Sequence, residues 1–385
     1  MRSIYLDYCT STPIAASVRE SMLPFLGEFY GHPSSDHWYG RAAQEAIEDS
    51  RSNLAAMLGC HPSEVIFTSG GTESVNIALL GVARAIGRAV SEGETPRILV
   101  SALEHECVRQ CAKQLESEGW QVDEIGCDEQ GVIRLTELED AIQPTTRLAS
   151  VIHASHRIGT IQPIAEIAEI CRQRDVLLHT DAAQSVGKIQ TTVDDLGVDL
   201  LTLTGHKFYA PKGIGALYVR TGVPVEPIMY GEGSEAGMRP GTANVPHIVA
   251  LGQAAKLAHA GLESAIQQTG DYRDRFHSQL ERAIGRDLRV HGAQAERLPG
   301  LLSLELPGVV AEKIHNMLPE ICFAPCVPAN GAKPQTACNR THAALGLSHE
   351  ASVSTLRVAF GWTTSIDEIH QAAQMIAAAY ESLTS

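Results

Sequence analysis

The sequence HTDAAQSVGK (179–188), followed by DLGVDLLTLTGHKFYAPKGIGALYV (195–219), contains the pattern from which the fold class can be predicted. It holds short apolar runs at 176–180, 200–204 and 215–219, and the run DLLTL shows no alternation of polar and apolar residues. Continuous apolar strands of this kind are typical of parallel sheets that are covered on both faces. This stretch therefore predicts the strands of an α/β domain.

On the N-terminal side of this stretch, the same kind of apolar run recurs at 65–68, 97–101, 121–125 and 148–152. Helical patterns lie between the runs, at 74–87, 106–118, 135–142 and 164–174. Strands and helices in alternation favour a mostly parallel sheet with helices on both faces. The expected fold is α/β, with a mostly parallel seven-stranded sheet in a large domain.

The pattern changes after about residue 249. Two helices are expected at 248–260 and 263–284, short strands at 301–306 and 355–360, and a last helix at 366–382. This order predicts a smaller α+β domain formed by residues 1–14 and 251–385, beside a large domain of residues 15–250. Residues 325–336 are rich in proline and glycine and predict an irregular loop.

Composition excludes several classes of protein. The chain has 385 residues, 44% of them hydrophobic, and a net charge of −15 from 30 basic and 45 acidic side chains. Clustered basic residues are needed to bind a phosphate backbone, so no nucleic-acid partner is expected. The chain has no run of about 18 apolar residues, and its start is too polar for a signal peptide. We therefore expect no membrane span and a cytoplasmic location.

The nine cysteines are an odd number in a long chain, which argues against a disulfide scaffold. Cys107 and Cys111 are spaced i, i+4, as are Cys322 and Cys326, but neither pair has a second pair of ligands at metal-site spacing. Most of these thiols are expected to be reduced core residues. No metal site is predicted.

Four predicted strand ends carry groups that could take part in catalysis or ligand binding. Lys207 follows one strand and Asp181 another, His105 follows a third, and the turn SGGTES (69–74) follows a fourth. Each has an ordinary explanation: a solvated lysine, a helix N-cap for Asp181, a structural histidine, or a capping box at the turn. Ligands of open α/β sheets bind beyond the carboxyl ends of the strands. A lysine, a carboxylate, an imidazole and a phosphate-binding turn at that edge are what a pyridoxal phosphate enzyme needs.

The chain resembles the class V aminotransferase superfamily of fold-type I enzymes, in the cysteine desulfurase and selenocysteine lyase branch. The resemblance runs from YLDYCTSTP (5–13) to STLRVAFGWTT (354–364) and includes SGGTESVN (69–76), LEHECV (103–108) and GMRPGTANVPHIVALG (237–252). It implies pyridoxal 5'-phosphate as the cofactor and an amino acid as the substrate. It also implies a homodimer and a possible sulfur acceptor protein.

The resemblance assigns roles to individual residues. Lys207 is the lysine that forms the Schiff base, His105 stacks on the ring, Asp181 pairs with the ring nitrogen, and Gln184 reaches the ring hydroxyl. The phosphate is expected on the glycine turn and on two strand-end residues, namely Gly71, Thr72, Thr204 and His206. Thr242 is expected to reach the active site of the neighbouring subunit. Arg357 is expected to anchor the substrate carboxylate, because its planar fork binds a carboxylate through two bonds.

Three departures from the family pattern lie near the substrate. The family loop carries a nucleophilic cysteine, and without gaps that position holds Asn330, with Cys326 four residues before it as a weak catalytic candidate and Cys338 eight residues after it. The family turn Asn-Asn-Glu-x-Gly reads SHRIG (155–159). The substituted residues Ser155 and His156, and also His32 in place of a family asparagine, are expected at the substrate.

Three functions remain open from the sequence. The first is a cysteine desulfurase or selenocysteine lyase that releases alanine and passes on sulfur or selenium. The second is a divergent lyase, or another transformation of a different amino acid, that needs no persulfide. The third is a degenerate paralogue without activity, against which the retained Lys207, Asp181, His105 and Arg357 argue.

Overall fold

The computed structural model describes residues 3–87, 93–325 and 339–385. Its centre is a seven-stranded sheet with the order β2-β8-β7-β6-β5-β3-β4. The strands are β2 (Val65–Thr68), β3 (Arg97–Ser101), β4 (Gln121–Ile125), β5 (Thr146–Ile152), β6 (Leu177–Asp181), β7 (Leu200–Thr204) and β8 (Gly215–Val219). The pairs from β4 to β7 are parallel, and β8 is antiparallel to both β7 and β2. The predicted mostly parallel seven-stranded sheet is confirmed.

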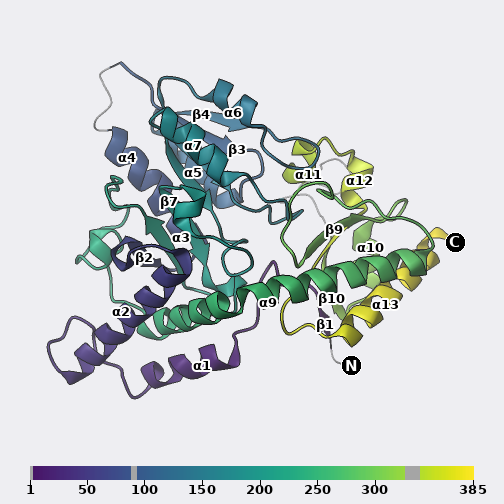
Figure 1. Cartoon of the computed structure of the whole chain (residues 1–385), viewed down its shortest axis with the longest axis horizontal. Coiled ribbons are helices and arrows are strands. Elements are labelled where there is room, and N and C mark those ends of the chain that lie inside the picture. Colours follow the sequence, from purple (N-terminus) through teal and green to yellow (C-terminus); the bar gives the residue numbers. More distant parts are fainter. Residues whose placement is uncertain (1–2, 88–92, 326–338) are drawn as a thin grey trace.

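Helices cover both faces of this sheet (Figure 1). They are α2 (Trp38–Leu58), α3 (Gly71–Asn76), α4 (Val82–Gly87), α5 (Glu106–Ser117), α6 (Leu135–Ala141), α7 (Ile164–Gln173) and the short α8 (Val193–Leu196). A π-helical turn, η3 (Ile77–Gly81), joins α3 to α4, so this region is helical from 71 to 87.

Successive strand residues enter two different hydrophobic cores, one on each side of the sheet. On β3, Leu99 belongs to one core, whereas Ile98 and Val100 belong to the other. On β7, Leu201 and Leu200 are divided in the same way. Side chains alternate between the faces of a strand, so a strand that is buried on both faces must be apolar throughout. This is why the sequence shows continuous runs of apolar residues at these strands.

A second, smaller group of elements surrounds a third core. It contains the antiparallel sheet β11-β12-β9 and the parallel pair β1-β10. Its strands are β1 (Ile4–Tyr5), β9 (Leu301–Glu305), β10 (Ile321–Cys322), β11 (Ala324–Pro325) and β12 (Thr355–Ala359). Its helices are α10 (Ala311–Met317) and α13 (Ile366–Thr384). The short helices α11 (Arg340–Ala344) and α12 (His349–Val353) pack instead in a separate small core with Ile152 of β5.

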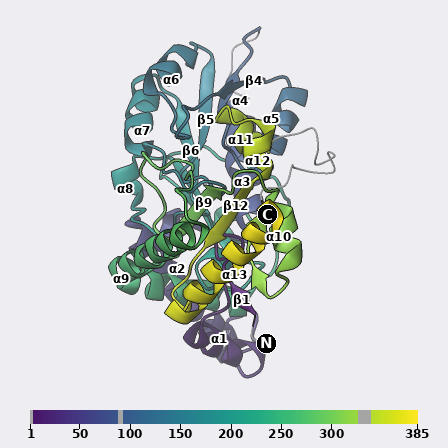
Figure 2. The same cartoon turned by 90° about the vertical axis from the view of Figure 1, so that its right-hand side faces the viewer.

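The helix α9 (Val245–Ile284) runs from the large sheet to the small core in Figure 1, and Figure 2 shows it nearly end-on. Leu251 packs in the core beside α2, and Phe276 packs in the small core. The predicted break between two helices near residues 261–262 is wrong. A glycine inside a helix costs only about 1 kcal/mol, and packing at both ends of α9 outweighs the cost of Gly261.

Near the N-terminus, Ile4 and Leu6 lie in the small core, whereas α1 (Ala16–Met22) packs against α9 near the large sheet. The division of the chain into domains at residues 14 and 250 stays a prediction. Within the described ranges, no helix has the length and apolar character needed to cross a membrane.

Candidate active site

A cavity of about 400 Å³ lies beyond the carboxyl ends of the parallel strands. It brings together most of the residues that the sequence singles out: Gly71, Thr72, His105, His156, Asp181, Gln184, Thr204, His206, Lys207 and Arg357. They come from β6, β7, β12, the starts of α3 and α5, and loops. The strand topology explains this convergence, because parallel neighbours end at the same edge of the sheet.

Lys207 ends the short 3-10 turn η4 (Gly205–Lys207), directly after β7. Burial lowers the pKa of its amine, an effect that Cys9 and Asp181 oppose. A lysine with a lowered pKa is more often in the neutral, nucleophilic form. The position therefore suits covalent chemistry with a carbonyl group.

Asp181 is the last residue of β6 and only 5% exposed. Its Oδ1 accepts a hydrogen bond of 2.9 Å from the backbone N–H of Ala183. The alternative role of Asp181 as a helix N-cap is wrong, because a turn follows β6 and the next helix, α8, begins only at Val193. A buried carboxylate that faces a cavity can pair with a cationic ring.

The glycine turn between β2 and α3 lies close against the end of β7. A Cβ at Gly71 would lie 3.7 Å from Thr204 Cβ, and Gly70 has a φ of 148°, which favours glycine. Glu73 Oε2 accepts a bond of 2.6 Å from the Ser69 N–H, but the N-cap, Gly70, has no side chain to complete a capping box. The free amides at the start of this helical region suit an anion.

His105 is the N-cap of α5 and is open to the cavity. Its Nδ1 accepts from the backbone N–H of Cys107 at 3.2 Å and lies 3.0 Å from Cys107 Sγ. Partial desolvation by the cavity walls lowers the pKa of the ring, against the attraction of Asp181. The ring meets His156 edge to face at 5.7 Å.

Arg357 lies on β12 and is 6% exposed. Its Nη1 donates to the His156 carbonyl oxygen at 2.8 Å. Its Nη2 donates to Asp7 Oδ1 at 2.9 Å and to Thr10 Oγ1 at 2.8 Å. These bonds hold the guanidinium at the wall of the cavity.

Other predicted site residues lie elsewhere. His32 and Thr242 line a separate cleft of about 900 Å³ beside α2. Ser155 is buried in its own turn, where its Oγ accepts from the N–H of Arg157 at 3.3 Å. Cys326 and Asn330 lie outside the described residues, as does Cys338.

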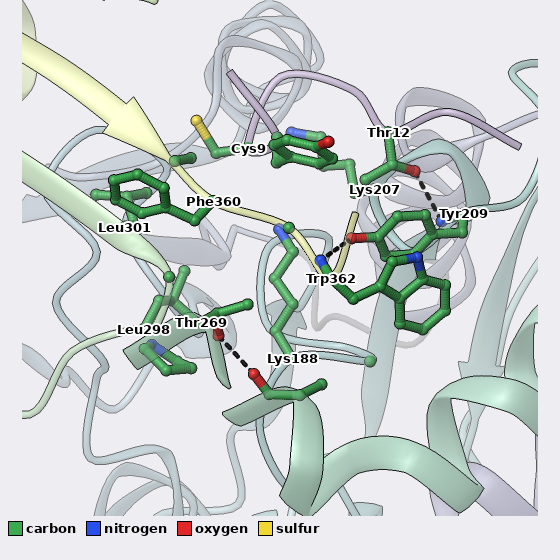
Figure 3. A pocket seen from close by; sticks show the side chains of 17 residues that line it. Cys9, Thr12, Lys188, Lys207, Tyr209, Thr269, Leu298, Leu301, Phe360 and Trp362 are labelled. Carbon is green, nitrogen blue, oxygen red and sulfur yellow. Dashed lines mark hydrogen bonds between the residues drawn. The ribbon is translucent and has the colours of Figure 1, made fainter. Parts of the chain in front are cut away.

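Among the cavity residues that sequence reasoning missed are Cys9, Cys107 and Lys188. Cys9 and Cys107 line the main cavity, and Cys9 also lines a smaller adjoining cavity of about 50 Å³ together with Lys188 and Lys207 (Figure 3). The one sequence signal was the closeness of Cys107 to His105.

Lys188 points into the small cavity, beside the stacked rings of Tyr209 and Trp362 (Figure 3). Its amine donates to Gln184 Oε1 at 3.0 Å, and Gln184 Nε2 donates to the Cys9 carbonyl at 2.8 Å. Burial and the charge of Lys207 lower the pKa of Lys188 to about 7. The pair of bonds fixes the orientation of the Gln184 amide.

The chain is similar to known proteins over nearly its whole length. The family model for aminotransferase class V matches residues 4–371. The chain is 35% identical to cysteine desulfurase IscS of Dictyoglomus turgidum over 99% of this chain and 95% of the relative. It is 36% identical to the cysteine desulfurase of Mus musculus, over 97% of this chain and 80% of that one.

Two solved structures share the fold. A NifS-like protein has a TM-score of 0.89 and 30% identity and covers 99% of both chains. The structure of SspA in complex with cysteine has a TM-score of 0.80 and 32% identity, over 93% of this chain and 99% of that one.

The cavity also fits the cofactor that such enzymes use. It presents an amine for a carbonyl group, a buried carboxylate for a ring nitrogen, an imidazole for stacking, and an anion-binding glycine turn for a phosphate. Each of these groups comes from a different segment of the chain. Their meeting in one cavity is therefore best explained by a shared role in binding the cofactor. The chain belongs to the class V aminotransferase family, within the superfamily of the cysteine desulfurases, and is a pyridoxal-phosphate-dependent enzyme.

Proposed function

We propose that this enzyme acts on a sulfur- or selenium-containing amino acid and releases alanine together with sulfur or selenium. The observation that carries the proposal is the single cavity in which Lys207, Asp181, His105 and Arg357 meet. The names of the desulfurase relatives support the choice of substrate class.

Each group has a proposed task at the cofactor. When bound, pyridoxal phosphate supplies an electron sink for the substrate carbons. Lys207 holds the cofactor and moves a proton, Asp181 keeps the ring nitrogen protonated, and Gln184 contacts the ring hydroxyl. His105 stacks on the ring. The phosphate group lies on the residues of the glycine turn and the end of β7, namely Gly71, Thr72, Thr204 and His206.

Arg357 has the proposed task of binding the substrate carboxylate. Its side chain is almost fully buried and is fixed by Asp7, Thr10 and the His156 carbonyl. A guanidinium that is already held in place loses little freedom when a carboxylate binds. Substrate binding therefore costs less than it would with a mobile arginine.

A second candidate reaction is the transformation of a different amino acid without a persulfide. Arg157 lines the cavity where the family turn has an acid, which makes this wall more cationic, and the neutral His156 stands where the family turn has an amide. The alignment of Asn330 with the family's loop cysteine also favours this candidate. Elimination would release pyruvate and ammonia in place of alanine.

The assembly is proposed to be a homodimer in which Thr242 reaches the partner's active site. Thr242 lines the cleft beside α2 and not the cavity of its own chain. Large apolar side chains stand exposed in the same region, among them Tyr230 at 82% and Met229 at 46%. A sulfur acceptor protein and a cytoplasmic location belong to the same proposal.

The test is product analysis. The cofactor-loaded enzyme is incubated with L-cysteine and L-selenocysteine, and alanine and pyruvate are measured. Alanine that disappears in Lys207→Ala supports the proposal, with Lys212→Ala, an exposed lysine nearby, as the matched control. Pyruvate without alanine supports the second candidate, and no product from any amino acid of a broad panel contradicts both.

A further inference from the structure

Two cysteines of α5 that the sequence presents as an equivalent pair lie in different surroundings. Cys111 is 3% exposed and packs in the core with Ile98 and Leu115. Cys107, one turn earlier, lines the main cavity together with His105 and Lys207. Only Cys107 is placed to influence the chemistry of the site.

The backbone N–H and the thiol of Cys107 both contact the same atom of His105, Nδ1. The backbone N–H donates to Nδ1 at 3.2 Å, and Sγ lies 3.0 Å from Nδ1. A ring nitrogen that accepts a backbone N–H bond carries no proton itself. The thiol is therefore the donor in the second contact, and in a neutral ring the proton must be on Nε2.

The surroundings of the thiol agree with its role as a donor. Burial raises the pKa of Cys107, and the carboxyl groups of Asp181 and Glu104 raise it further. A neutral thiol can donate its S–H, although it is a weak donor. A thiolate in the same place could only accept, and would require a proton on Nδ1.

The charged groups around the ring come from several elements. They are Asp181 on β6, Lys207 on η4, Glu106 on α5 and Arg157 after β5, and the neutral His156 meets the ring edge. Because acidic and basic groups are both present, their effects on the pKa of the His105 ring partly cancel. The local contact with Cys107 then decides which nitrogen holds the proton.

We propose that Cys107 is a positioning residue whose N–H and S–H together hold His105 in the tautomer with its proton on Nε2. The proposal rests on the assignment of His105 to the cofactor in the section above. Its consequence is that a ring stacked on the cofactor presents a defined Nε2–H and keeps Nδ1 unavailable for proton uptake.

The test is NMR of the enzyme labelled with 15N-histidine, with the His105 signals assigned from His105→Gln. The expected result is an unprotonated Nδ1 and a protonated Nε2 at pH 7.5, with and without cofactor. In Cys107→Ala, the loss of one donor to Nδ1 should raise the His105 pKa by roughly half a pH unit to one pH unit. Cys107→Ser, whose hydroxyl is also a donor, should restore it, and Cys111→Ala is the matched control.

Alkylation provides a second measurement. In a neutral pair, Cys107 should react with iodoacetamide slowly at pH 6 to 7, as followed by peptide mass spectrometry. Rapid alkylation at pH 6, or a proton found on Nδ1, would show a thiolate–imidazolium pair and overturn the proposal. An unchanged His105 pKa in Cys107→Ala would overturn it as well. None of these readouts requires turnover, so they stay separate from the test of the substrate.

Discussion

Arg357 Nη2 donates to Asp7 Oδ1 at 2.9 Å, and this contact joins β12 to the segment that follows β1. The two residues are 350 positions apart in the chain. Their side chains are only 7% and 20% exposed. The ion pair therefore fixes the proposed carboxylate anchor before any substrate arrives.

The first prediction concerns this anchor. Arg357→Lys should lower kcat/KM for the substrate about 100-fold, because an ammonium cannot form the two parallel bonds of a guanidinium. Asp7→Asn should lower it about 10-fold, mainly through KM, since Arg357 stays present but is less firmly placed. Steady-state release of alanine measures both. Asp36→Asn, which alters an exposed pair with Arg41, is the control and should leave the rate unchanged.

The second prediction compares two glycines of the same helix. A Cβ at Gly252 would lie 2.5 Å from the Ser50 Cα on α2, whereas nothing lies within 4 Å of a Cβ at Gly261. Gly252→Ala should therefore lower the free energy of unfolding by about 1–3 kcal/mol, because α2 must move away from α9. Gly261→Ala should raise it by up to about 1 kcal/mol, because alanine favours the helix. Urea titration at fixed protein concentration measures both; a loss at Gly261 would mean that α9 is not continuous.

The third prediction concerns pH and Glu104, which is 2% exposed. Burial, followed by the charge of Asp181, raises the pKa of this carboxyl to about 8. Its Oε1 accepts from Ser101 Oγ at 2.8 Å and from the Ile152 N–H at 2.6 Å, and Oε2 has no partner among the described residues. An oxygen without a partner is less costly to bury in a neutral carboxyl than in a charged one, which agrees with the raised pKa.

The direction in which stability changes with pH follows from the raised pKa of Glu104. The folded state keeps a proton that the unfolded chain loses above its ordinary pKa of about 4.5. The contribution of Glu104 to stability is thus complete below that value and is lost as pH rises towards 8. Glu104→Gln keeps the acceptor and removes the charge, so it should be more stable than the parent by about 2 kcal/mol at pH 8 and about equal to it at pH 4. The exposed Glu116→Gln should show the same difference from the parent at both pH values.

The fourth prediction concerns the ion pair of Arg51 and Glu235, whose side chains are 11% and 9% exposed. Glu235 also accepts a bond of 2.8 Å from the Phe67 N–H on β2. Glu235→Ala removes both bonds to the Arg51 guanidinium, which keeps only Glu48 and the Val65 carbonyl, and leaves the Phe67 N–H without its acceptor. It should cost about 2–4 kcal/mol of stability. Asp36→Ala, which removes a pair that is 60% and 104% exposed, should cost less than about 1 kcal/mol. Equal losses in the two variants would contradict the burial of the first pair.

Much of the large sheet could be predicted from the sequence. Every predicted strand of that sheet is present, with differences of one or two residues at the ends of β5 and β6. The site residues at strand ends, such as Lys207 and Asp181, were also found, because parallel strands place their carboxyl ends at one edge. The helix break near Gly261 was wrong, since local propensity is weak beside packing at both ends of α9.

The large sheet, and the edge of it at which the reactive groups lie, can be predicted from the sequence alone, because burial on both faces requires uninterrupted apolar strands. Which polar groups meet in the cavity depends on the folded structure. Spacing along α5 does not distinguish Cys107 from Cys111, and nothing local joins Asp7 to Arg357. These contacts depend on how segments far apart in the chain pack together. Hydrophobic periodicity indicates which face of a helix or strand is buried, but it does not indicate which neighbouring element covers that face.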